Sequence, residues 1–563
     1  MENTFRLKNG NYIKVSLTDT PSQIHYQIYN KDNELCFDKI SGIPLSISNR
    51  TDIMRNIKEM LPPHKRSDTS AELDKIKRQL QKIVLALQGE AEFEEARLQQ
   101  ERELELRKKI HSAKKRLEVL DDPIIYVGTI IDWLTAGERV NTLLCFIAGC
   151  SQVILKKPIS VIGYGESSSG KTHVERVALS LLPDEYIVIE KQVSPAALFN
   201  RAKIDERFYD GKIVVYGDMG GEKDHDNQQE AFDLMKELQS DGKISKPVSV
   251  KDETNNWVTE DLVLIGNPCL WYTTVPTDID NQELSRAIVF TPRMDNQRIF
   301  NIRGRALSFK KGKSYAMFEE IEKKAAEIPY MIEHLRQTLS EYIIINPYFD
   351  VITEILSQSK FYKRDTEKYV SLLDTITALN FYQNDKYIFD DGSKAVITSR
   401  DDVHLLLSLL EPYKTSIAFN IKPKSAEIYK ELTSEVVEGI TFAEELKYAD
   451  DKEEWSTGFT SREYFEKSKI DLSLRSVQRY ISDLYQAGLL TVKDRQNNTN
   501  LYDVVEHDLK DTLNEIDYES IAERTEYELG FDIAEIIRND VEDETLDIYN
   551  IHEDIGGTQW GNK

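Results

Sequence analysis

The stretch Ile159-Ser-Val-Ile-Gly-Tyr164, followed by Gly165-Glu-Ser-Ser-Ser-Gly170-Lys171-Thr172, decides the fold of this 563-residue chain. A short apolar strand runs into a GxxxxGK[ST] sequence, and a helix-favouring stretch follows from His173 to Leu182. The glycines let backbone N–H groups curl around phosphate oxygens at the amino end of a helix, where the dipole also favours negative charge. The sequence therefore predicts a nucleoside triphosphate site, with ATP and Mg²⁺ as the expected ligands.

The residue types in this phosphate loop indicate separate roles. Lys171 is expected to bridge the β- and γ-phosphates, and the Thr172 hydroxyl is expected to ligate Mg²⁺. The loop as a whole supplies the predicted nucleotide-binding residues, which are Gly165, Glu166, Ser167, Ser168, Ser169, Gly170, Lys171 and Thr172.

Around this loop, from about residue 121 to 301, short apolar stretches alternate with helical patterns. That alternation is typical of an α/β domain with a parallel sheet. The expected strands are Ile159–Tyr164, Tyr186–Ile189, Ile213–Tyr216, Leu262–Ile265 and Ala287–Thr291.

An acidic residue follows the predicted strand Ile213–Tyr216. Asp218 ends the run Ile213-Val-Val-Tyr-Gly-Asp218, and Met219 stands where many ATPases carry a second acid. Two interpretations remain open. Either Asp218 orders Mg²⁺ and the base lies elsewhere, with Glu222 nearby, or Asp218 is itself the base and Gly217 replaces the usual acid.

Two further polar residues complete the predicted catalytic set. Asn267 follows the strand Leu262–Ile265, where it can reach the γ-phosphate and orient the attacking water. Arg286 precedes the last strand, where it can point across a subunit boundary at a neighbour's γ-phosphate. The predicted catalytic residues are Lys171, Asp218, Asn267 and Arg286, and the predicted metal ligands are Thr172 and Asp218.

At these residues the sequence resembles an AAA+ ATPase, and more narrowly the MCM-like helicases. It is most similar to replication-initiator helicases and primase-linked ATPases of phages and mobile genetic elements. The motifs that carry the resemblance are GESSSGKT at 165–172, IGNP at 265–268 and LSR at 284–286. The resemblance implies that Asn267 is the sensor asparagine, that Arg286 is the arginine finger, and that subunits form a ring, expected to be a hexamer, with ATP between them. The motif GDMGG at 217–221 departs from the family because it lacks the paired acid.

The family also places a β-hairpin just before the sensor strand, where it projects into the ring pore. Here a polar turn at Asp252–Asn256 separates two β-favouring arms. The residues expected to contact single-stranded DNA are Lys243, Lys246 and Lys251, through phosphates, and Trp257, through base stacking. The alternative is a solvated surface hairpin with Trp257 packed beneath it.

A second nucleic-acid element is predicted at 459–502, which has the pattern of a winged helix. A capped helix begins near Thr460, a second helix spans Leu474–Ala487, and the strands Leu489–Lys493 and Asn500–Val504 flank a polar tip. The residues expected to contact duplex or origin DNA are Arg475, Gln478, Arg479, Lys493 and Arg495. Protein docking is the alternative use of such a unit.

The remaining segments complete a multidomain α/β organisation. The predicted parts are a small β-rich N-terminal domain at 1–50, a charged helical spacer at 51–120, an AAA+ P-loop core at 121–304, a helical lid at 305–420, a winged-helix domain at 421–506 and an acidic tail at 507–563. An apolar seam from Leu73 to Leu87 favours a packed helical hairpin over an oligomerising coiled coil. The tail is expected to be a solvated terminus that is partly helical.

Composition sets the outer limits. The chain has 72 basic and 97 acidic residues, a net charge of −25, and it is 40% apolar, which excludes a collagen-like or wholly disordered chain. No apolar run approaches the roughly 20 residues of a membrane span, and no signal-peptide pattern is found. The four scattered cysteines argue against a disulfide framework or structural zinc, so a cytoplasmic protein is expected.

Together these patterns predict a ring-forming, ATP-dependent DNA helicase and replication initiator that works with a partner such as a primase. One alternative is an AAA+ protein remodeller or helicase loader. Another is a nucleotide switch that does not move on DNA, such as a regulator or an anti-phage sensor, which the single acid at Asp218 favours.

Overall fold

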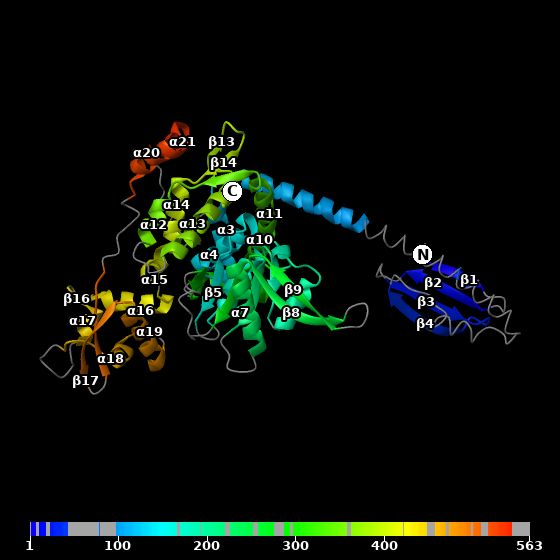
Figure 1. Ribbon diagram of the computed structural model, residues 1–563, viewed down its shortest axis with the longest axis horizontal. Helices are drawn as coiled ribbons and strands as arrows, with labels where there is room; N and C mark the ends of the chain where they lie inside the picture. The colour runs from blue at the N-terminus through cyan, green and yellow to red at the C-terminus, as the bar shows by residue number, and fades with distance from the viewer. Residues whose placement is uncertain are drawn as a thin grey trace. The chain divides into compact units, whose positions relative to one another are not determined.

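The computed structural model describes most of the chain as two compact units, Met1–Lys109 and Ile110–Lys563 (Figure 1). The described residues are 2–6, 11–17, 23–42, 78, 97–165, 169–191, 193–219, 226–251, 257–274, 286–292, 297–356, 362–419, 421–437, 439–447, 456–468, 472–496, 499–507 and 516–542.

The first unit contains a four-stranded antiparallel meander, β1 to β4. Its strands are Glu2–Arg6, Tyr12–Leu17, Gln23–Tyr29 and Leu35–Gly42. Alternate residues are completely buried, namely Ile13, Val15, Tyr26 and Ile28, which confirms the predicted small β structure. A helix spans residues 97–117 across the boundary of the two units. The apolar seam from Leu73 to Leu87 lies outside the described residues.

The second unit is built on a five-stranded sheet in the order β11-β5-β10-β7-β6, with every neighbouring pair parallel. The strands are Ala287–Phe290, Ser160–Tyr164, Cys269–Thr274, Ile213–Asp218 and Ile187–Ile189. Four of the five predicted strands are confirmed. Leu262–Ile265 is also a strand, as part of β9, but its expected place in the parallel sheet is wrong: it pairs antiparallel with β8, and the strand between β5 and β7 is β10, whose six residues are all buried.

The sequence signal for β10 is the run Cys269-Leu-Trp-Tyr-Thr-Thr274, which follows Asn267-Pro268. A strand buried on both faces reads as a continuous apolar run rather than an alternating one. Leu262–Ile265 has the same apolar character but belongs to a hairpin. From composition alone, either this run or Cys269–Thr274 could be the strand between β5 and β7. The hydrogen-bonded pairing of β10 with β5 and β7 shows which of the two runs joins the sheet.

Helices cover both faces of the sheet. Val161, Ile213 and Trp271 face a core shared with α3 (Pro123–Thr135), α4 (Arg139–Cys150) and α5 (Lys171–Ser180). Ile162 and Val214 face the opposite core, which includes Phe232 and Met235 of α7 (Asp226–Asp241). This alternation of side chains follows from the two-residue period of a strand and buries both faces of the central strands, while Ile189 of the edge strand β6 is 60% exposed.

A long antiparallel hairpin connects α7 to β10. Strand β8 (Lys243–Lys251) pairs with β9 (Trp257–Ile265) from Lys243 opposite Ile265 to Lys251 opposite Trp257. The prediction of a hairpin with its turn at Asp252–Asn256 is confirmed at both arms, while the turn itself lies outside the described residues.

A mainly helical region follows β11. Its helices are α9 (Gln297–Phe309), α10 (Lys313–Ala325), α11 (Ile328–Leu339), α12 (Phe349–Leu356), α13 (Tyr362–Leu379), α14 (Arg400–Leu410) and α15 (Lys414–Phe419). A small sheet of β12 (Tyr342–Ile345), β14 (Lys394–Ile397) and β13 (Lys386–Ile388) adds to the helices that the sequence predicts.

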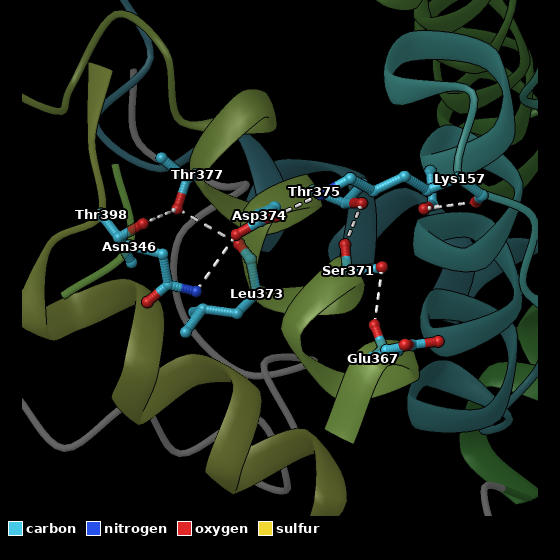
Figure 2. Close-up of polar contacts among 10 residues, drawn as sticks. Lys157, Asn346, Glu367, Ser371, Leu373, Asp374, Thr375, Thr377 and Thr398 are labelled. Carbon is cyan, nitrogen blue, oxygen red and sulfur yellow. Dashed lines mark hydrogen bonds and ion pairs between the residues drawn. The ribbon is translucent and has the colours of Figure 1, made fainter. Parts of the chain in front are cut away.

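Helix α13 contacts the residues just before β5, the strand that leads into the phosphate loop. Lys157, three residues before β5, forms an ion pair with Asp374 of α13 at 2.6 Å. Asn346 donates a 3.1 Å hydrogen bond to the other carboxylate oxygen of Asp374, as Figure 2 shows. The Asp374 side chain is only 9% exposed, whereas Lys157 is 47% exposed, so the ion pair is partly open to water while it joins α13 to the residues just before β5.

The C-terminal part confirms the predicted helix-helix-hairpin order. Helix α18 (Ser461–Lys467) is capped by Thr460, and α19 (Leu474–Gln486) by Ser473. The hairpin strands are β17 (Leu490–Gln496) and β18 (Thr499–Val504). The elements before them are α16 (Pro423–Thr433), β15 (Glu435–Val437), β16 (Ile440–Thr441) and α17 (Phe442–Lys447).

The acidic tail is not simply solvated. Helices α20 (Tyr518–Leu529) and α21 (Phe531–Glu542) form a pair in which Ile521, Ile533 and Ile537 are buried. Ile521 and Ile537 join the same core as the helices around α14. The expectation of a solvated terminus is therefore wrong for 518–542, because its periodic apolar residues supply a packing face.

Candidate nucleotide site

The phosphate loop begins and ends as its glycines require. Gly170 has φ +94°, a left-handed conformation that glycine adopts without strain, and α5 starts at the next residue. The Lys171 side chain is 95% buried, with only 5% of its surface exposed, and its Nζ donates to the carbonyl oxygen of Gly165 at 2.7 Å. The ammonium group therefore lies inside the curve of the loop. Glu166, Ser167 and Ser168 lie outside the described residues.

Two hydroxyl groups beside the loop fit a phosphate. Ser169 Oγ and Thr291 Oγ1 are both buried, and neither has a hydrogen-bond partner among the residues that the structure describes. A Cβ on Gly165 would lie 3.3 Å from Ser169 Oγ and 3.7 Å from Thr291 Cγ2, so both side chains border the same glycine. A buried hydroxyl without a partner costs free energy, and phosphate oxygens can accept from both groups. These residues, with Lys171, therefore suit a bound phosphate.

The predicted metal ligands belong to segments at the carboxyl edge of the sheet, where β10 lies between β5 and β7. Thr172 is exposed at the first turn of α5. Asp218 ends β7, and its backbone pairs with Thr273 in the neighbouring strand β10. The Asp218 side chain and Glu222 lie outside the described residues, so both interpretations of the acid remain open. Among described residues, no three His, Cys, Asp or Glu side chains gather as a metal cage. Mg²⁺ ordinarily needs only one or two protein ligands beside phosphates.

Thr273, at the end of β10, lies beside Lys171 and was not predicted. A Cβ on Gly163 would lie 3.1 Å from Thr273 Cγ2 and 3.2 Å from Lys171 Cβ, so these two side chains flank that glycine. Thr273 is 4% exposed. The signal that could have identified it is the polar pair Thr273-Thr274, which ends a run of four apolar residues.

Asn267 and Arg286 lie at the opposite edge of the sheet. Asn267 precedes β10, and Cys269 pairs with Ile213, the first residue of β7. The prediction that Asn267 stands at a strand tip near the phosphate loop is therefore wrong. Arg286 precedes β11, beside Ala287, which pairs with Ser160 at the start of β5. Arg286 Nη1 donates to Ser240 Oγ at 2.6 Å, so it does not serve the phosphate loop of its own subunit.

A buried carboxyl group lies one turn beyond Lys171. Glu175 is 6% exposed, and within the described part of the chain its Oε1 has no hydrogen-bond partner. Burial raises the pKa of Glu175 to about 7, although Lys191 and Arg176 act in the opposite direction. Its charge therefore changes near neutral pH directly below the phosphate loop.

Three elements meet at His173, the residue after Thr172. Arg303 of α9 donates through Nη1 to the carbonyl oxygen of Leu134 and lies 3.3 Å from His173 Nε2. Burial lowers the pKa of His173, and the nearby Arg303 guanidinium lowers it further. This contact joins α9 and the last turn of α3 to the phosphate-loop helix α5.

The hairpin separates its predicted DNA contacts onto two faces. Lys243 is exposed and lies on one face of the hairpin by strand register. Lys246 lies on the other face with the buried Ile244, and its Nζ is 5.8 Å from the centre of the Phe199 ring. The side chains of Lys251 and Trp257 lie outside the described residues.

The helix α19 has an exposed face and a docked flank. Arg475 and Gln478 are exposed, as predicted. Tyr480 is buried, and its hydroxyl lies 3.3 Å from that of Tyr164, the last residue of β5. Arg479 is half-buried and lies near enough to lower the pKa of Tyr164, although burial raises that pKa overall. Arg475 and Arg479 therefore do not share a fully open face.

The basic residues of the hairpin after α19 form contacts within that hairpin. Lys493 Nζ is 3.6 Å from Asp503 Oδ2, and Arg495 Nε donates to Asn500 Oδ1 at 3.0 Å. Both side chains are exposed. Exposed pairs of this kind are worth at most about 1 kcal/mol, so phosphates can displace them.

Comparison with known proteins gives one family. A family described as the MTBMA_p00010 P-loop domain matches residues 109–328, which include the phosphate loop, the sheet and the hairpin. No curated protein matches the chain. The match indicates a nucleotide-binding P-loop domain. Separately, none of the described helices combines the length and apolar character that a bilayer crossing demands.

Proposed function

We propose that the protein is an ATP-dependent motor that acts on DNA, of the AAA+ and MCM-like type that its motifs resemble, and that it works as a ring, expected to be a hexamer. The observation that carries this proposal is the position of the β8–β9 hairpin. The hairpin is followed after three residues by β10, whose penultimate residue Thr273 borders Lys171. A change at the nucleotide is thereby connected to a basic hairpin through one strand.

In this proposal each subunit holds ATP through the phosphate loop. Lys171 and the Ser169 and Thr291 hydroxyls bind phosphate oxygens, while Thr172 and Asp218 hold Mg²⁺, which would neutralise phosphate charge. Thr273 takes the water-orienting role that the sequence assigned to Asn267. Arg286, at the far edge of its own sheet, supplies positive charge to the site of the next subunit.

The proposed DNA contacts come from two elements. Single-stranded DNA follows the hairpin through Lys243, Lys251 and Trp257, with Lys246 contributing near its base. The α18–α19 unit and its hairpin act as a winged helix that binds duplex or origin DNA through Arg475, Gln478, Lys493 and Arg495. Helix α9 and the helices after it act as the lid over the nucleotide. A primase or other replication protein is the proposed partner.

The test is ATP hydrolysis by the purified protein with and without single-stranded DNA. We expect DNA to stimulate turnover, and we expect Lys171→Ala to abolish both the basal and the stimulated rates. A strand-displacement assay with a forked duplex then examines movement. Turnover that is the same with and without DNA contradicts the motor and supports a protein remodeller or helicase loader.

A nucleotide switch is the second candidate, and one specific observation favours it. Asp218 is followed by Met219 rather than by a second acid, and the buried Tyr164–Tyr480 contact joins the phosphate-loop strand to α19. A slow ATPase with such a contact suits a regulator that changes shape with its nucleotide. Tight ATP binding without measurable turnover supports this candidate.

A further inference from the structure

Helix α9 and the turn after it form the most basic segment in the described part of the second unit. Residues 297–314 contain six Lys or Arg residues and no Asp or Glu, in a chain whose net charge is −25. The segment ends in a tight turn in which Lys310 has φ +48° and Gly312 has φ +90°. Positive charge is thus concentrated on one short piece of an acidic protein.

The basic residues of this segment are open to solvent. Arg298, Arg305, Lys310 and Lys311 are all exposed. Within the described residues, none of these four forms an ion pair or a hydrogen bond through its side chain. Lysine and arginine side chains on a protein surface commonly pair with neighbouring carboxylates, so an unpaired group of four leaves its charge available to a partner.

Aromatic rings are exposed beside these charges. Phe300 is 52% exposed and Phe309 is 70% exposed, and Leu307 between them is 52% exposed. Phe309 follows Arg305 by four residues, so it lies on the side of the helix that carries Arg298 and Arg305, whereas Phe300 and Leu307 are seven residues apart and share the other side. The inner side of the same helix is buried through Ile299 and Ala306, which orients the exposed residues away from the core.

We propose that the surface defined by Arg298, Arg305, Phe309, Lys310 and Lys311 is a binding site for single-stranded nucleic acid. Cations bind the phosphates, and exposed rings stack on bases, which are accessible only where strands are unpaired. The partner is therefore a polyanion with aromatic groups, and the absence of acidic residues from the segment excludes a basic protein partner. The proposal goes beyond the motor function because it requires binding but neither hydrolysis nor movement.

Helix α9 also connects this surface to the nucleotide site. Its inward-facing Arg303 contacts Leu134 and His173, the residue after Thr172. A strand bound on the outer face of α9 therefore contacts the same helix whose Arg303 reaches the phosphate-loop helix at His173. This position distinguishes the α9 surface from the β8–β9 hairpin, which reaches the site through β10 instead.

The test is fluorescence anisotropy with the full-length protein and a labelled oligothymidylate of about 30 nucleotides, long enough for several contacts. The double variant Arg298→Ala/Arg305→Ala is expected to weaken binding about 10-fold and to flatten the salt dependence by roughly 0.7 per lost phosphate contact. Phe309→Ala is expected to weaken binding about 10-fold at every salt concentration, as the loss of one stacked base would. An oligouridylate of equal length distinguishes DNA from RNA.

Matched controls separate local from general effects. Lys115→Ala removes an exposed charge, and Phe531→Ala removes a ring that is 56% exposed, both outside the α9 surface. Both should bind as the wild type does. Binding of a fluorescent ATP analogue, measured on the same samples, reports on the nucleotide site independently of any nucleic acid.

Two results would overturn the proposal. One is wild-type affinity in both α9 variants, or no binding of single strands by the wild type, while the ATP analogue still binds. The other is a change in oligomeric state in Phe309→Ala, seen by light scattering, with unchanged nucleic-acid affinity, which would make the surface a contact between copies of the chain. Failure to bind the ATP analogue would contradict the proposed function and leave the α9 result to be judged on anisotropy alone.

Discussion

The two edges of the core sheet differ sharply in what they hold. The carboxyl edge brings together the phosphate loop, Asp218 and Thr273 from three neighbouring strands. The amino edge holds Asn267 and Arg286, which the sequence places in the same catalytic set. The difference teaches that the order of motifs along the chain does not determine the edge on which each motif lies. Strand pairing decides that, and one misassigned strand moves its polar residue to the far side of the domain.

The largest effect is expected at the carboxyl edge. Lys171→Ala should weaken ATP binding at least about 100-fold, because a charge-assisted contact to phosphate is lost from a buried position. Lys212→Ala is the matched control, since Lys212 lies at the amino edge and bonds to the Glu185 carbonyl oxygen. Isothermal titration calorimetry measures both. Equal losses in the two variants would show that the edges do not differ in nucleotide binding.

The buried carboxyl group of Glu175, at the carboxyl edge, should also make the free energy of unfolding depend on pH. The pKa of Glu175 is raised from 4.5 to about 7, so the folded state holds a proton that the unfolded state releases. Stability from this group is therefore complete below pH 4.5 and is lost as pH rises through 7. Glu175→Gln should raise stability at pH 8 by about 2 kcal/mol and have little effect at pH 5.

Urea unfolding at the two pH values measures this difference. Glu237→Gln, which changes an exposed residue of α7 at the amino edge, is the control and should be neutral at both. A Glu175→Gln variant that is equally destabilised at pH 5 and pH 8 would mean that the carboxylate has a polar partner.

The sharpest comparison sets Thr273 against Asn267. Thr273→Val keeps the shape of the side chain and removes its hydroxyl, so turnover should fall about 10-fold, the value of one hydrogen bond made in the transition state. ATP affinity should change little. Asn267→Ala should leave both quantities within about 2-fold. Steady-state kinetics with an independent binding measurement tests the pair, and a larger loss in Asn267→Ala would restore the original assignment.

The smallest effect is expected where α9 meets α5. Arg303→Ala removes contacts to Leu134 and His173 and should weaken ATP binding about 5-fold, or about 1 kcal/mol. The pKa of His173 is lowered in the folded state, so the stability that it contributes is lost as pH falls. The melting temperature should therefore fall more steeply between pH 7 and pH 5 for the wild type than for His173→Gln. Equal slopes would contradict this contribution.

Sequence reasoning succeeded where local chemistry is decisive. The phosphate loop, four core strands, the β8–β9 arms and the α18–α19 order all follow from short-range signals such as Gly170, the Thr460 and Ser473 caps, and polar turns. It failed at β10, because two apolar runs separated by Gly266-Asn267-Pro268 are equally suited to the sheet. Only long-range pairing with β5 and β7 selects the second run.

The same limitation explains the other differences. The docked flank of α19 depends on Tyr164, more than three hundred residues earlier, and no periodicity within α19 reveals it. The packing of α20 and α21 depends on a core built from distant helices. Thr273 and Arg303 carry no motif at all, and they join the site only because strands and helices bring them to Lys171 and His173.

The central claim is that a nucleotide site on the carboxyl edge drives movement on DNA. ATP turnover by the full-length protein, with and without single-stranded DNA and alongside Lys171→Ala, tests it most directly. The account predicts a basal rate that rises several-fold with DNA and disappears in the variant. A rate that DNA leaves unchanged, or ATP binding with no turnover in either condition, would contradict it.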